Sequence, residues 1–106
     1  MKKCLKIFIL GEIIMWEKWE HKDNTAIKAE KYKDEAFIDI YKEKEHYEII
    51  CSVKEAIIFH TIYEEGTEKQ ALVKYEEVKK DLENIIDSYT NENELEDLCY
   101  EFIEKW

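Results

Sequence analysis

Hydrophobic and polar positions alternate with a period near two from Thr25 to Tyr63. Short runs of β-branched and aromatic residues are separated by charged breaks such as Lys54–Glu55. Such runs are typical of strands that bury one face, and short connections favour neighbouring antiparallel strands. We therefore predict an antiparallel meander of about four strands, near residues 27–30, 37–41, 47–53 and 57–63.

The period changes to three and four after Gly66, and this change predicts two amphipathic helices. Thr67 with Gln70 three residues later has the pattern of a capping box, and Asn91 with Glu94 opens a second helix. A sheet followed by two helices packed on one face is an α+β architecture. The apolar stripes are Leu72, Tyr75, Val78, Leu82, Ile85, Ile86 and Tyr89 in the first helix, and Leu95, Leu98, Cys99, Phe102, Ile103 and Trp106 in the second.

The first fifteen residues partly resemble a signal peptide, but they do not fit that pattern fully. Two lysines precede an apolar run, as in a signal peptide, but Lys6 and Glu12 interrupt the run and no cleavage site follows. The run is also too short to span a membrane. We expect a short ordered strand or helix here. Alternatively, residues 1–14 are an upstream extension before a true start at Met15.

Length predicts one domain, residues 1–106, and the absence of catalytic motifs predicts a protein without catalytic chemistry. The three cysteines contain no Cys-x-x-Cys pair and fit a reducing cytosol. None of the three histidines has metal-ligand spacing, and the two isolated glycines form no phosphate loop. Cys51 and His60 lie on neighbouring predicted strands, so they are either a thiol–imidazole pair or packed residues. We expect a cytoplasmic protein that is not an enzyme and needs no metal or cofactor.

The charge of the chain is strongly asymmetric. Residues 1–63 carry 11 Lys against 12 acidic residues, whereas residues 64–106 carry 5 Lys against 14, so nearly all of the net charge of −10 lies on the predicted helices. The chain contains no Arg. Direct binding of DNA or RNA is therefore not expected, because phosphate contacts need clustered cations.

The second helix carries the most regular acidic pattern. Its acids recur at steps of three and four residues, which is about 4.5–6 Å along a helix axis and resembles the roughly 6–7 Å between phosphates of an extended single strand. Lys105 is spaced to screen Glu101, and two of the acids oppose the helix dipole. This predicted acidic stripe, a candidate partner-binding surface, consists of Glu94, Asp97, Glu101 and Glu104. A solvated face of an acidic protein gives the same pattern.

Other candidate contact residues lie on both predicted helices. Tyr100 falls off the apolar stripe of the second helix, next to the acids, and is the aromatic residue most expected in a contact. Glu76, Glu83 and Asp87 on the first helix are further candidates, although Lys69 and Lys80 share their face and indicate an ordinary solvated surface. Three tryptophans pack beneath the helices or anchor an interface, namely Trp16, Trp19 and Trp106.

This organisation resembles small phage-encoded inhibitors of bacterial defence, especially anti-CRISPR proteins, some of which place three antiparallel strands ahead of two acidic helices. The likeness lies in the strands between Thr25 and Tyr63 and in the helices led by Thr67 and Asn91. It is architectural, without a shared motif. It implies a protein in the host cytoplasm whose helix acids mimic DNA phosphates and block a CRISPR nuclease.

Two other functions remain open from the sequence. An immunity protein that neutralises a nuclease toxin would use the same acidity, and a structural or oligomeric adaptor would need no inhibitory role. The expected partner of an inhibitor is a basic host protein, and the chain itself is either a monomer or a homodimer. A rigid array of carboxylates facing a Lys/Arg groove associates rapidly, and more weakly as salt is raised.

Overall fold

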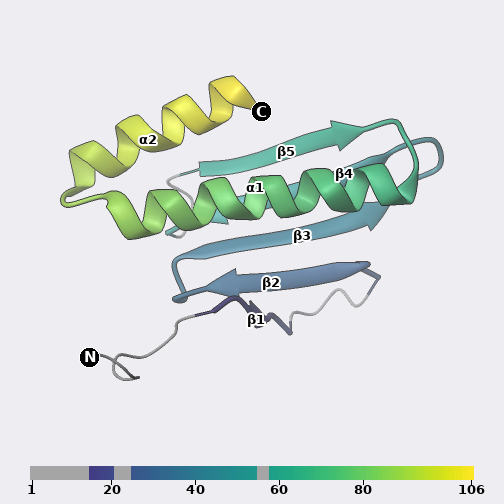
Figure 1. Ribbon diagram of the computed structural model, residues 1–106, viewed down its shortest axis with the longest axis horizontal. Coiled ribbons are helices and arrows are strands. Elements are labelled where there is room, and N and C mark those ends of the chain that lie inside the picture. The colour runs from purple at the N-terminus through teal and green to yellow at the C-terminus, as the bar shows by residue number, and fades with distance from the viewer. Residues whose placement is uncertain (1–14, 21–24, 55–57) are drawn as a thin grey trace, which may run out of the picture.

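The computed structural model describes residues 15–20, 25–54 and 58–106, and both expectations for residues 1–14 lie outside this part of the chain. Its elements follow the predicted order, strands first and helices afterwards (Figure 1). The strands are β1 (Glu17–Lys18), β2 (Lys28–Tyr32), β3 (Ala36–Lys42), β4 (Tyr47–Val53) and β5 (Ile58–Glu64), and the helices are α1 (Glu68–Ser88) and α2 (Glu92–Lys105).

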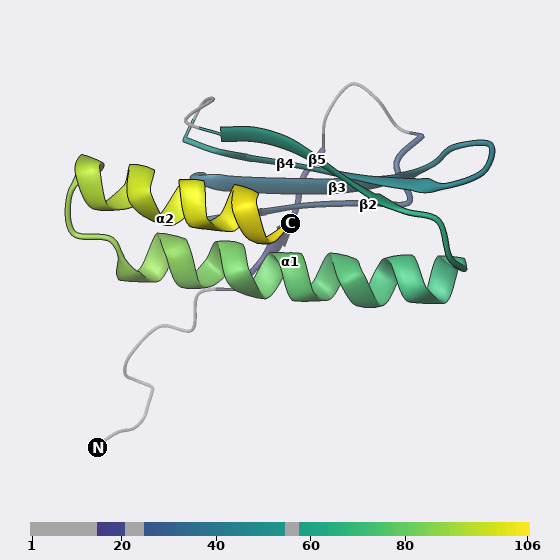
Figure 2. The ribbon, with the colours of Figure 1, turned by 90° about the horizontal axis from the view of Figure 1, so that it is seen from above.

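The sheet is an antiparallel meander in the order β1-β2-β3-β4-β5, and both helices lie on one of its faces (Figure 2). The α+β prediction is confirmed. The described part of the chain has one strand more than the predicted four, because the short strand β1 pairs Glu17 with Lys31 and Lys18 with Glu30 at the β2 edge. This strand comes from the segment that contains Trp16 and Trp19.

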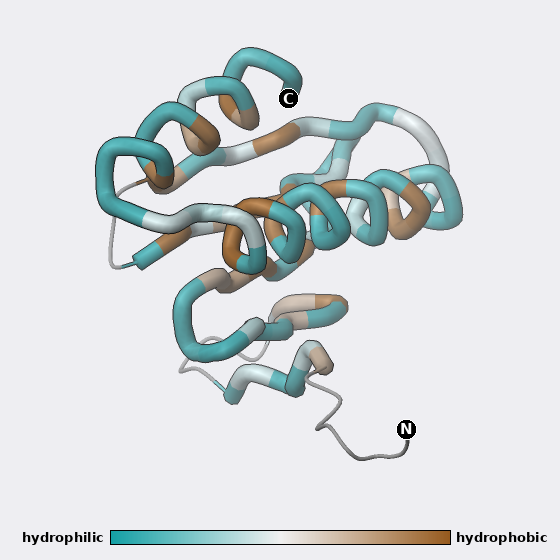
Figure 3. The backbone as a smooth tube through the Cα atoms, turned by 60° about the vertical axis from the view of Figure 1, so that its left-hand side comes forward, coloured by the Kyte–Doolittle hydropathy of each residue, from teal (hydrophilic) through white to brown (hydrophobic). Residues whose placement is uncertain are grey.

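The core lies between the sheet and the two helices, and α2 lies beside α1 on the β5 side (Figure 1). Alternation in β4 buries Tyr47, Ile49, Cys51 and Val53 under the helices, as expected for a strand with one covered face. Hydrophobic positions recur along both helices (Figure 3), and those of α1 include the fully buried Tyr75. Burial of these side chains is the main favourable contribution to folding.

The helix starts follow the sequence signals. Thr67 Oγ1 accepts a hydrogen bond from the backbone N–H of Gln70, whose side chain accepts one from the N–H of Thr67, so the predicted capping box is present. Asn91 caps α2 by accepting from the N–H of Glu94. Of the helices described, neither is long and apolar enough to cross a membrane.

Candidate functional site

Helix α2 is attached to the rest of the protein along a narrow apolar stripe. Leu95, Cys99 and Phe102 are buried, and they recur at steps of four and three residues, which places them on one side of the helix. At its C-terminal end, Lys105 Nζ and Trp106 Nε1 both donate to Asp81 Oδ2 of α1, at 2.7 and 3.0 Å. The opposite side of α2 therefore faces solvent.

Lys105 does not fulfil the screening role predicted for it. The sequence spacing places it one turn after Glu101, but the side chain reaches across to Asp81 on α1. Its charge is thus satisfied by an acid of the neighbouring helix, which no local spacing rule foresees. Lys105 is the only cation of α2, so the acids along the outer side of this helix have no lysine of their own.

The acidic face of α2, as we define it, consists of Glu96, Asp97, Glu101 and Glu104. All four side chains are exposed, and within the described residues none of them has an ion pair or a side-chain hydrogen bond to another group. Three of the four belong to the predicted stripe. The fourth, Glu96, was missed because it lies outside the three- and four-residue steps from Glu94, although its position directly before Asp97 was a usable signal.

Glu94, the remaining member of the predicted stripe, has a local structural role. Its carboxylate accepts hydrogen bonds from the backbone N–H and the hydroxyl of Thr90, at 2.7 and 3.1 Å. An acid in the first turn is also favourable to the helix dipole. Glu94 is exposed, but its hydrogen bonds at the start of α2 explain its presence, and no binding partner is needed to account for it.

Tyr100 stands among these acids with 65% of its surface exposed. It follows Glu96 by four residues and Asp97 by three, and it precedes Glu104 by four, so all three are its neighbours on the helix surface. An exposed tyrosine offers a rigid aromatic surface with a polar tip. The structure thus brings Tyr100 together with the acidic face, as the sequence predicted.

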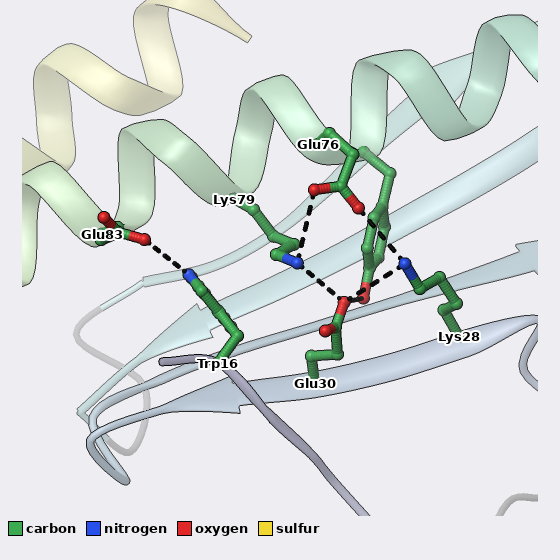
Figure 4. A network of polar contacts seen from close by, with 7 residues as sticks. Trp16, Lys28, Glu30, Glu76, Lys79 and Glu83 are labelled. Carbon is green, nitrogen blue, oxygen red and sulfur yellow. Dashed lines mark hydrogen bonds and ion pairs between the residues drawn. The ribbon is translucent and has the colours of Figure 1, made fainter. Parts of the chain in front are cut away.

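The acids predicted on α1 lie in a different environment, because they bridge the helix to the sheet. Figure 4 shows Lys79 between Glu30 of β2 and Glu76 of α1, with Nζ–Oε1 distances of 3.0 and 3.4 Å. Glu76 also lies 3.3 Å from Lys28 Nζ. Glu83 accepts a hydrogen bond of 3.0 Å from Trp16 Nε1.

Glu30 is the centre of this network. Burial alone would raise the pKa of its carboxyl group, but hydrogen bonds from Lys79 and Tyr75 and the charges of Lys79 and Lys28 outweigh burial and hold the pKa below its ordinary value. The Tyr75 hydroxyl donates to Glu30 Oε1 at 3.0 Å. The network fixes α1 on the sheet, and its acids are already neutralised.

Asp87, the third predicted acid of α1, bridges the far end of the helix to the β2–β3 turn. Lys33 Nζ donates to Asp87 Oδ1 at 2.9 Å, and the Tyr32 hydroxyl lies 2.9 Å from both carboxylate oxygens. The hydrogen bond from Lys33, followed by that from Tyr32, lowers the pKa of Asp87 against the opposing effect of burial. The α1 candidates therefore have identifiable structural roles, unlike the acidic face of α2.

Cys51 and His60 are register partners on β4 and β5, as their predicted strands suggested. The thiol lies 3.5 Å from the carbonyl oxygen of His60, and the imidazole ring packs edge-on against Phe102 at 6.3 Å. Burial raises the pKa of the Cys51 thiol to about 12. The geometry thus favours packed residues over a thiol–imidazole pair. Among the residues described, no group of three or more His, Cys, Asp or Glu side chains is placed to hold a metal ion.

Comparisons with protein-family models, with curated proteins and with solved structures find no match for this chain. The described residues form an α+β protein in which four exposed carboxylates without an ion pair lie together on the outer side of α2.

Proposed function

We propose that the protein is a non-enzymatic inhibitor whose acidic α2 face occupies a basic, nucleic-acid-binding surface of another protein. The observation that carries this proposal is the contrast between the acids predicted on the two helices. Glu76, Glu83 and Asp87 of α1 have partners in Lys28, Trp16 and Lys33. The acidic face of α2 is exposed, and its four carboxylates have no ion pair among the described residues. Acids that cost helix stability without a structural partner point to a functional role.

The spacing of the acidic face suits a polyanion-binding groove. Asp97, Glu101 and Glu104 rise along α2 in steps of about 4.5–6 Å, close to the roughly 6–7 Å between phosphates of an extended strand. Lys105 and the buried stripe hold the helix on α1, so the carboxylates are presented on a rigid support. A preorganised charge array of this kind gives fast, salt-sensitive association with a Lys/Arg groove.

The target class that we favour is a CRISPR effector nuclease, since the order of strands and acidic helices is similar to that of some anti-CRISPR inhibitors. In this account the protein acts in the host cytoplasm and competes with DNA for the nuclease channel. It does not bind nucleic acid itself, because its lysines are scattered and it has no Arg. Tyr100 supplies the aromatic contact within the charged surface.

An order-of-addition experiment tests the proposal. Purified, guide-loaded CRISPR nuclease is mixed with the protein before or after target DNA, and cleavage and complex formation are measured. Competition predicts inhibition when the protein is added first and much weaker inhibition when DNA already fills the channel. Equal inhibition in both orders, or equal binding at low and high salt, would contradict occupation of the DNA channel. Binding to a nuclease toxin and to no CRISPR nuclease would instead assign the immunity function.

A further inference from the structure

An open groove lies between α1 and α2, beside the acidic face of α2. The two helices run next to each other (Figure 2), and the groove between them has a volume of about 190 Å³. A small-molecule site usually has about 300–1,000 Å³, so this groove has room for a single side chain of another molecule. Its lining residues are Asp81 and Ile85 of α1 and Leu98, Glu101, Phe102 and Lys105 of α2.

The floor of the groove is apolar. Ile85 and Phe102 are only 7% and 4% exposed, and Leu98 is partly buried against the same core. Leu98 and Phe102 are four residues apart, so they form a continuous apolar strip along α2. A side chain that enters the groove therefore needs an apolar part to cover this floor.

The rim of the groove is acidic, and one of its two carboxylates lacks a counter-charge among the described residues. Asp81 already accepts hydrogen bonds from Lys105 Nζ at 2.7 Å and from the Trp106 indole at 3.0 Å. Glu101 is exposed and has no ion pair in the described part of the chain. It is three residues from Leu98, so the two side chains are neighbours on the surface of α2. The groove thus combines an apolar floor with one carboxylate that can take a new partner.

We propose that this groove binds one arginine side chain of the basic partner, with the aliphatic stem on Leu98 and Phe102 and the guanidinium group on Glu101. The inference rests on the function proposed above for the acidic face, and it names a side chain that the partner must supply. Arginine matches both parts of the groove, because its methylene groups cover apolar surface while its charged head stays at the rim. The planar guanidinium group also donates two parallel hydrogen bonds to one carboxylate.

Other side chains fit the groove less well. An apolar side chain would remove water from Glu101 without replacing its hydrogen bonds, and this loss costs free energy. Lysine carries the same charge as arginine, but its ammonium group is more strongly hydrated and has no planar fork for bidentate binding. Arginine is also enriched among the residues that dominate the binding energy of protein interfaces. The groove should therefore distinguish arginine from lysine, whereas the other exposed acids of α2 should attract both alike.

Two short peptides separate this groove from general attraction between opposite charges. Both consist of lysines, except that the central residue of one peptide is arginine, so their net charges are equal. Dissociation constants are measured by NMR titration of the full chain at low salt. The arginine peptide is expected to bind at least about threefold more tightly. It should also shift the indole N–H signal of Trp106, because this group donates to Asp81 at one wall of the groove.

Two matched variants locate the preference for arginine. Glu101→Gln should abolish it, so that the two peptides bind equally. Glu104→Gln removes the same charge from an acid of α2 that does not line the groove, so it should weaken the binding of both peptides and keep the ratio of their dissociation constants. Leu98→Ala retains every charge and should lower this ratio, because the arginine stem loses part of its floor. Circular dichroism verifies the fold of each variant.

The arginine site and the acidic face as a whole give different results in this titration. Equal affinities of the two peptides for the wild-type protein would overturn the arginine site and leave the proposed function of the acidic face in place. So would an arginine preference that survives in Glu101→Gln or disappears in Glu104→Gln. If neither peptide bound at low salt, the acidic face would not attract cations, and the arginine site and the proposed function would fail together.

Discussion

Lys105 Nζ lies 2.7 Å from Asp81 Oδ2, and this contact joins the last turn of α2 to the middle of α1. The Trp106 indole donates to the same oxygen at 3.0 Å. The Asp81 carboxylate thus holds the C-terminal end of α2, and it forms an ion pair with Lys105, the only cation of that helix. Both contacts hold α2 on α1, and they leave the acidic face of α2 without a counter-charge among the described residues.

Replacing Asp81 should loosen this end of α2. Asp81→Ala removes both hydrogen bonds, and since the ion pair is partly exposed, we expect a loss of only about 1 kcal/mol in the free energy of unfolding. Amide hydrogen exchange should accelerate in the last turn of α2. Glu77→Gln, an exposed α1 acid, is the control. Unchanged exchange near Trp106 in Asp81→Ala would show that the apolar stripe alone holds the helix.

Neutralising acids of α2 should stabilise the protein. Glu101 and Glu104 are three residues apart near the C-terminal end of the helix, where they repel each other and oppose the dipole. The double variant Glu101→Gln/Glu104→Gln is expected to raise Tm by a few degrees in a calorimetric scan. Glu76→Gln, which removes an acid paired with Lys28 and Lys79, should lower it. A lower Tm for the α2 double variant would mean that these acids have structural partners after all.

Stability should fall in acid because of the network around Glu30. Its pKa in the folded state lies below the ordinary 4.5, so its contribution is fully present above about pH 4.5 and is lost as the pH falls through the folded value. Urea unfolding at neutral and acidic pH measures this loss. Glu30→Gln should be less stable by about 1–2 kcal/mol at pH 7 and should show a shallower pH dependence than wild type. If the stability of Glu30→Gln and that of wild type changed equally with pH, Glu30 would not be the cause of the loss in acid.

The two described cysteines should be inert in the folded protein. Burial raises the pKa of Cys51 to about 12 and that of Cys99 to about 11, so both thiols are protonated and inaccessible at neutral pH. Alkylation followed by peptide mapping should leave them unmodified until urea unfolds the chain. Rapid modification of Cys99 in native protein would indicate that α2 detaches from the core under native conditions.

The strands and helices were predictable because their periodicity is local, but β1 and the turns were not. Strand β1 has only two residues, both exposed, and its position depends on Trp16, which contacts the ring of Tyr32 and donates to Glu83, 67 residues away. The β2–β3 turn places Lys33 and Asp34 at positive φ, a conformation that usually signals its presence through Gly or Asn.

The part of the candidate site that follows from local helical periodicity was predictable, and the part that depends on contacts between distant residues was not. Helical spacing alone grouped Asp97, Tyr100, Glu101 and Glu104 on α2. It could not separate these acids from those of α1, because Lys28 on β2 and Lys33 in the β2–β3 turn, the partners of Glu76 and Asp87, lie some 50 residues earlier. Only the folded sheet and its β2–β3 turn bring Lys28 and Lys33 to them.

Affinity for a guide-loaded CRISPR nuclease, measured across a range of salt concentrations, tests whether the acidic face of α2 binds a basic groove. The variant Glu96→Gln/Asp97→Asn/Glu101→Gln/Glu104→Gln neutralises the acidic face of α2. Its charge-matched control, Glu43→Gln/Glu45→Gln/Glu65→Gln/Glu77→Gln, removes four exposed acids elsewhere. We predict that the α2 variant binds at least about 100-fold more weakly at low salt with a flatter salt dependence, while the control binds like wild type. Equal affinities of the two variants would contradict the account.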